Sequence, residues 1–110
     1  MVISIAIRDR QLLSFNYEGY GRLVEPHTYG VDSKGHTALR AFQVSGGSES
    51  GETTGWKIFH VQQMQGTSGV AQTFSGPRPG YKRDDKAFRV IHAELLGLPW
   101  KLMSLIPSYS

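Results

Sequence analysis

The chain has 110 residues, of which 39% are hydrophobic and 19% charged, and its formal net charge is +3. A chain of this length has room for one domain with a single core. It has no cysteine, which excludes disulfides, thiolate metal sites and cysteine nucleophiles, and no apolar run near the roughly 20 residues that cross a bilayer. We therefore expect a cytoplasmic protein without a membrane partner. The 13 glycines favour a β fold with many tight turns over a helical bundle.

The chain opens with a helix signal and continues as a strand. Apolar residues at positions 3–7 precede the charged segment 8–10, which predicts a short helix with one apolar face. Leu13, Phe15 and Tyr17 then alternate with polar residues, which is the period of a half-buried strand.

A second strand follows a glycine turn. Residues 18–21 contain two glycines, whose backbone adopts a positive φ without steric cost. The next strand, residues 22–29, contains Pro26, which has no amide donor. We therefore expect this strand to lie at a sheet edge or to carry a bulge at Pro26.

Two further strands are predicted in the middle of the chain, over residues 39–44 and 56–61. A hairpin turn at residues 32–35 precedes the first of them. A glycine- and serine-rich surface loop at residues 45–55 separates the two strands. In the first strand, alternation places odd-numbered residues on one face and even-numbered residues on the other.

The C-terminal part is predicted to contain fewer strands. Residues 64–70 have the composition of a turn-rich connection, residues 71–74 of a short final strand, and residues 76–81 of a loop. An aspartate at position 84 or 85 is expected to cap a helix that extends to about Leu96.

The predicted fold is mainly β: a small SH3-like or Sm-like β-barrel with a short helix at each end. Short β proteins close or curl to protect their strand edges. The barrel domain is expected to span residues 1–96, and residues 97–110 form an unusually apolar tail.

Seven short motifs follow one another along the chain. They are Ala6 on the helix, Phe15-x-Tyr17, Gly19, Arg22-x-Val24-x-Pro26, Tyr29-Gly30, Leu39-x-Ala41-Phe42 and Lys57-x-Phe59-His60-Val61. In this order they resemble the WYL domain family over residues 3–94. Where that family has its naming tripeptide, this chain has Thr37-Ala38-Leu39 and keeps only the leucine. The resemblance implies a standalone Sm-like barrel that binds an anionic ligand or nucleic acid and regulates a partner.

Arginines are the first candidates for ligand binding. The resemblance marks Arg22, whose planar guanidinium suits a phosphate or a carboxylate; the alternative is a surface pair with Glu18 or Glu25. If Arg22 lies at the surface, Arg22→Ala is expected to weaken binding of the anionic ligand without unfolding the domain. Arg40 lies among apolar neighbours on its strand, so it needs either solvent or an anionic partner.

The densest basic segment is residues 78–83, where Tyr81 offers a ring for stacking. The alternative is a proline-stiffened loop with solvated lysines. Lys57 and His60 lie on one predicted strand but on opposite faces. The full candidate ligand-binding set is Arg22, Arg40, Lys57, His60, Arg78, Tyr81, Lys82 and Arg83.

Catalytic and metal-binding signals are not found in the sequence. The four histidines, which have no metal-ligand spacing, are His27, His36, His60 and His92. There is no nucleophile motif and no argument for a carboxylate pair. We therefore expect no enzyme activity, no metal and no cofactor.

The sequence favours a non-catalytic regulatory module. It would bind an anionic ligand, a nucleotide or a single-stranded nucleic acid, and pass that occupancy to a protein effector. The alternative is a protein-interaction or oligomerisation module without a small ligand. In that case the apolar tail, residues 97–110, would dock on a second copy or another protein; packing on its own domain is the simpler expectation.

Overall fold

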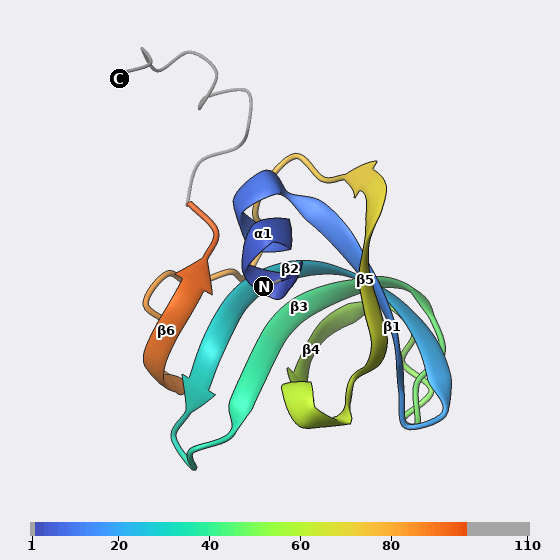
Figure 1. Ribbon diagram of the computed structural model, residues 1–110, viewed down its shortest axis with the longest axis horizontal. Coiled ribbons are helices and arrows are strands. Elements are labelled where there is room, and N and C mark those ends of the chain that lie inside the picture. Colours follow the sequence, from blue (N-terminus) through green and yellow to red (C-terminus); the bar gives the residue numbers. More distant parts are fainter. Residues whose placement is uncertain (1, 97–110) are drawn as a thin grey trace.

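The computed structural model describes residues 2–96, which form a mainly β fold with one short helix (Figure 1). The elements are α1 (Val2–Asp9), β1 (Gln11–Tyr17), β2 (Tyr20–Asp32), β3 (Thr37–Gly46), β4 (Gly55–His60), the 3-10 turn η1 (Val61–Gln63), β5 (Gln65–Thr73) and β6 (Phe88–Glu94). The six strands form one antiparallel sheet in the order β4-β3-β2-β1-β5, with β6 paired to β2. The expected N-terminal helix and first four strands are confirmed. Since β4 and β5 do not pair, the sheet among these residues is not closed into a barrel.

Strand β2, with 13 residues, connects most of the sheet. One of its edges pairs with β3 along nearly its whole length. The other edge is shared: its first residues, 20–24, pair with β1, and its last residues, 28–32, pair with β6.

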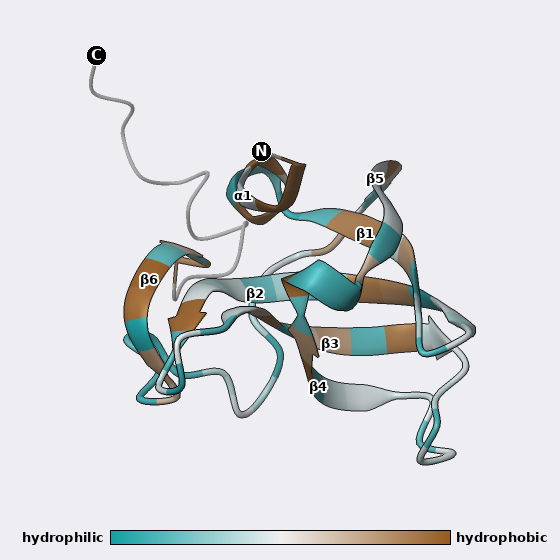
Figure 2. Ribbon diagram, turned by 60° about the horizontal axis from the view of Figure 1, so that its bottom comes forward, coloured by the Kyte–Doolittle hydropathy of each residue, from teal (hydrophilic) through white to brown (hydrophobic). Residues whose placement is uncertain are grey.

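The sheet bends so strongly that its two ends face each other across the core. Phe15 of β1 and Phe59 of β4 have ring centroids only 4.9 Å apart, although β2 and β3 separate these strands in the sheet. Figure 2 shows β1 and β5 on one side of the fold and β3 and β4 on the other. Helix α1 covers an open part of this core with the apolar side chains of Ile3, Ala6 and Ile7, which are all buried.

Pro26 lies in the central strand, and of the two expected alternatives, an edge position or a bulge, the structure has the bulge. Pro26 is opposite Ala41, and Thr28 is opposite Arg40, which leaves His27 as the extra residue of β2. A bulge of this kind bends the strand and re-aims a side chain.

Strand β5 corrects the predicted turn-rich connection, because residues 65–70 form its first part. Of its two glycines, Gly69 lies close to β1, whereas Gly66 has a positive φ of 64° and open space beside it. A Cβ atom on Gly69 would lie 2.7 Å from the side-chain oxygen of Gln11. Glycine within a strand marks a bulge or a close approach, and β5 shows both, because its register with β1 shifts between Ser14 and Asn16.

The predicted C-terminal helix is wrong, because residues 88–94 form strand β6. Asp85 caps a turn: its side chain accepts a hydrogen bond from the Ala87 amide at 2.9 Å. Strand β6 fits against β2 because Gly30 has no side chain, and a Cβ atom there would collide with the backbone of Val90. Among residues 2–96, no helix has the length and apolarity needed to span a membrane. The predicted apolar tail, residues 97–110, lies outside the described residues.

Candidate functional site

A pocket beside β3 and β4 brings two of the predicted ligand-binding residues together. Arg40, Lys82, Trp56, Gly80 and Asp85 line this pocket, which has a volume of about 310 Å³. Arg40 Nε donates to Asp85 Oδ2 at 2.6 Å, so the expectation that Arg40 needs an anionic partner or solvent is confirmed. We call this pocket the basic pocket, because its two cations outnumber its one carboxylate.

The loop after β5 is fixed against β4 at the wall of the basic pocket. The indole Nε1 of Trp56 donates to the carbonyl oxygen of Pro79 at 2.9 Å. Gly80 follows with a φ of 93°, a conformation that favours glycine. Lys82 is exposed, and within residues 2–96 no carboxylate lies at ion-pair distance from it.

Arg78 ties the same loop to β2. Its Nε and Nη2 atoms donate to the two carboxylate oxygens of Glu25 at 2.7 and 3.0 Å. Its guanidinium also lies 4.4 Å from the centre of the Phe42 ring, a cation–π distance. Arg78 is therefore engaged with the protein's own groups.

Arg78→Ala is expected to lower the free energy of unfolding by about 2 kcal/mol, because Glu25 would lose the partner of a buried charge. The Glu25 side chain is only 8% exposed. Chemical denaturation measures the effect, and Lys82→Ala in the same loop is the matched control. Adding Glu25→Gln to Arg78→Ala should recover part of the loss; a double variant that is as unstable as the sum of both single variants would contradict the pairing.

His27, which the sequence analysis did not select, is fully buried beneath this loop. Its Nε2 accepts a hydrogen bond from the Arg78 amide at 3.1 Å. Its Nδ1 therefore carries the proton and donates to the Glu25 carbonyl oxygen at 2.8 Å. The ring packs against Trp56 and Tyr81, with centroids 4.6 and 5.2 Å away. Burial lowers the pKa of His27 to about 4, so the imidazole is neutral at physiological pH. In the sequence, only the bulge expected at the neighbouring Pro26 pointed to an unusual position for this side chain.

Tyr81 and Arg83 connect the loop to β6. The Tyr81 hydroxyl donates to the carbonyl oxygen of Leu95 at 2.6 Å, and burial raises the pKa of Tyr81 to about 12. Arg83 Nη2 lies 3.4 Å from Glu94 Oε2. Of the cations predicted in residues 78–83, Lys82 is thus the one without an acidic partner in the described chain.

Arg22 is buried, away from the basic pocket. Its Nη1 donates to Gln43 Oε1 at 3.1 Å and its Nη2 to the Tyr17 carbonyl oxygen at 3.2 Å. Of the two acidic partners that we considered, Glu18 lies close, 3.5 Å from Nη2, while Glu25 binds Arg78. The surface position expected for Arg22 is therefore wrong.

Lys57 and His60 also lie outside the basic pocket. Lys57 Nζ donates to Ser48 Oγ at 3.1 Å. His60 Nε2 lies 4.0 Å from Asp32 Oδ2. The predicted ligand-binding set is thus divided among several parts of the fold.

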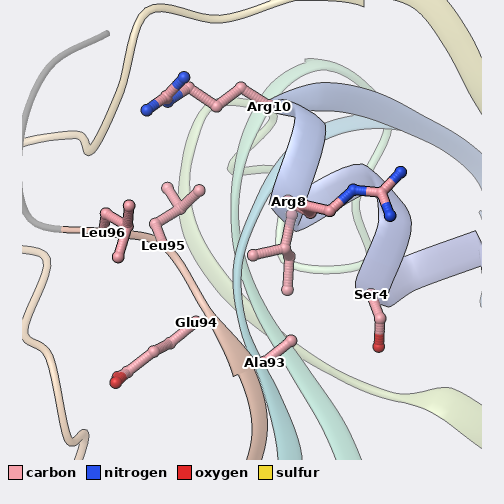
Figure 3. Close-up of a pocket in the computed structure, with 8 residues that line it drawn as sticks. Ser4, Arg8, Arg10, Ala93, Glu94, Leu95 and Leu96 are labelled. Atoms are coloured by element: carbon pink, nitrogen blue, oxygen red, sulfur yellow. The ribbon is translucent and has the colours of Figure 1, made fainter. Parts of the chain in front are cut away.

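A second pocket of about 310 Å³ lies between α1 and the end of β6 (Figure 3). Its apolar lining comes from Ile7, Ala93, Leu95 and Leu96, and polar side chains stand at its rim: Ser4, Arg8, Arg10 and Glu94. The sequence did not reveal this apolar pocket, because its β6 wall was predicted to be helical.

The fold and these pockets define a small, mainly β protein with a bent antiparallel sheet and a basic pocket at one side. Comparisons of the chain with protein-family models, with curated proteins and with solved structures find no match.

Proposed function

We propose that this protein is a non-catalytic regulatory module that binds an anionic ligand, a nucleotide or a single-stranded nucleic acid, in the basic pocket. The observation that carries the proposal is the meeting of Arg40, Lys82 and the Trp56 indole around one pocket of about 310 Å³. Cations attract phosphate, and an aromatic ring stacks on any base.

The two cations would contribute in different ways. Asp85 holds Arg40 through Nε, which orients the guanidinium while its terminal nitrogens stay available to donate to a phosphate. Lys82 would add a mobile point charge at the rim. Trp56 is held in place by its bond to Pro79, so its ring would offer a fixed surface to a base.

We further propose that the fold is a divergent relative of the SH3-like or Sm-like barrels of the WYL type, left open between β4 and β5. Its support is the N-terminal helix, the consecutive order of β1 to β4 in the sheet and the bend that brings β1 to β4. Motif residues of the resemblance also occupy the core, since Phe15, Tyr17 and Val24 are buried.

The test is fluorescence anisotropy with labelled nucleotides and short single-stranded DNA and RNA over a range of salt concentrations. We expect binding that weakens steeply with salt and is reduced roughly tenfold by Lys82→Gln. The matched control is Lys86→Gln, which removes the same charge from a side chain that is 93% exposed and outside the pocket. Equal affinities of the two variants would remove the basic pocket from the binding site.

The alternative function, a protein-interaction or oligomerisation module, is supported by the apolar pocket between α1 and β6. Under this alternative no nucleotide or nucleic acid binds even at low salt. The same anisotropy experiment therefore separates the two proposals.

A further inference from the structure

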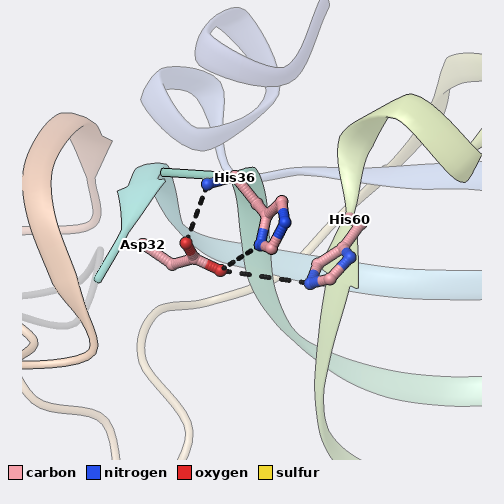
Figure 4. A group of neighbouring side chains, drawn as sticks. All are labelled: Asp32, His36 and His60. Carbon is pink, nitrogen blue, oxygen red and sulfur yellow. Dashed lines mark hydrogen bonds and ion pairs between the residues drawn. The ribbon is translucent and has the colours of Figure 1, made fainter. Parts of the chain in front are cut away.

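Three metal-ligating side chains meet at one end of the sheet (Figure 4). They are Asp32 at the end of β2, His36 in the turn before β3, and His60 at the end of β4. Asp32 Oδ2 lies 3.4 Å from His36 Nδ1 and 4.0 Å from His60 Nε2. One ligand atom from each residue lies within 4.8 Å of the other two.

The hairpin fixes the carboxylate of this cluster. Asp32 Oδ1 accepts hydrogen bonds from the backbone amides of Lys34 at 2.9 Å and His36 at 2.8 Å. With Oδ1 held in this way, Oδ2 faces the two imidazoles, as Figure 4 shows. Hydrogen bonds that orient a ligand group in advance are typical of metal sites.

The imidazoles are placed side by side by the pairing of the strands. His60 is opposite Ala38 in the β3–β4 ladder, and its amide donates to the Tyr17 hydroxyl at 3.1 Å. The rings of His36 and His60 stack with centroids 4.7 Å apart and planes 28° apart. Each ring has a nitrogen near the same carboxylate oxygen.

We propose that Asp32, His36 and His60 bind a divalent transition-metal ion of the Zn²⁺ type. Two imidazoles and one carboxylate are a donor set that such ions prefer, and three protein ligands leave one position open to water. With bonds of roughly 2.0–2.1 Å, tetrahedral ligand atoms lie about 3.3 Å apart. The Asp32–His36 distance already fits. The His60 side chain is 42% exposed, so its ring has room to turn out of the stack with His36 and aim Nε2 at the ion. This site is separate from the basic pocket and goes beyond the proposed function.

Two cations lie near the cluster and would oppose the metal's charge. Lys34 lines the same pocket as the three ligands. Arg89 of β6 reaches the turn at Gly35. Removing the charge of Lys34 should therefore tighten metal binding, an effect that depends on the ion lying at this place.

The test is calorimetric titration of the metal-free, untagged full chain with ZnCl₂ near neutral pH. We expect one ion per chain, bound more than about tenfold more weakly by His36→Gln and by His60→Gln, and several-fold more tightly by Lys34→Gln. The matched control is His92→Gln, which removes an exposed histidine of β6 outside the cluster. Asp32→Asn is a further variant that keeps an oxygen to cap the hairpin while losing the charge.

The absence of Zn²⁺ binding, or equal loss in His92→Gln and His60→Gln, would overturn the proposal. A second measurement needs no variant. In imidazole NMR spectra of the native chain, Zn²⁺ should shift the ring signals of His36 and His60 and leave those of His27 and His92 in place. Any other pattern would contradict the assignment.

Discussion

Arg22→Ala is expected to lower the free energy of unfolding by about 4 kcal/mol, because it empties a buried site and removes hydrogen bonds from a charged group. The guanidinium lies 5.5 Å from the ring centres of both Tyr17 and Phe59. Truncation would leave Gln43 Oε1 and the Tyr17 carbonyl oxygen without their donor. Denaturant unfolding monitored by tryptophan fluorescence measures the loss.

Two variants separate the contributions of Arg22. Arg22→Met keeps the apolar stem and should cost less than the alanine variant if packing dominates. Glu18→Gln removes only the exposed partner of Arg22 and should change stability by less than about 1 kcal/mol. An Arg22→Ala protein as stable as the native one would show that the buried guanidinium contributes nothing to the fold.

Acid is expected to destabilise the protein by about 3 kcal/mol as the pH falls from 6.5 to about 4, because of His27. Burial lowers the pKa of His27 from 6.5 to about 4, so the unfolded chain takes up this proton before the folded chain does. The contribution is complete above pH 6.5 and is lost as the pH falls toward 4. Unfolding free energies measured at several pH values across this window show how steeply stability falls with pH.

His27→Gln is the variant that tests this origin, because glutamine keeps a donor and an acceptor but does not titrate. The fall of the unfolding free energy between pH 6.5 and 4 should be smaller in this variant and unchanged in His92→Gln. Hydrogen bonds, first that from the His36 amide, lower the pKa of Asp32 from 3.8. Asp32 therefore loses its contribution only at more acidic pH. An unchanged slope in His27→Gln would assign the acid sensitivity to other groups.

The sequence predicts those elements whose signals are local. The alternation of Leu13, Phe15 and Tyr17 and the apolar face of α1 need no knowledge of the partner elements, and both predictions are confirmed. The signals at Gly69 and Gly30 are not local. Each glycine lies against a distant strand, and for that reason β6 and the first part of β5 were not predicted. The short strand predicted over residues 71–74 corresponds to the end of β5.

The candidate site likewise combines features with a local sequence signal and features that depend on distant parts of the chain. The sequence shows that Arg40 needs a counter-charge, but Asp85 as its partner follows only from the way the loop packs on β3. Burial of Arg22 depends on Phe59 and Gln43, which two other strands contribute. The cluster of Asp32 and His36 is completed by His60 from β4, so a search for ligand spacing along the chain does not find it.

Strand β2 shares one edge between β1 and β6, and the two pairings differ in how far apart their strands lie in the sequence. The β1–β2 pairing closes a short turn, whereas β3, β4 and β5 lie between β2 and β6 along the chain. Closing that long loop costs more entropy, and contacts so distant in sequence slow folding. We therefore expect the two halves of the shared edge to open separately, with β6 detaching while the β1–β2 and β2–β3 ladders stay intact.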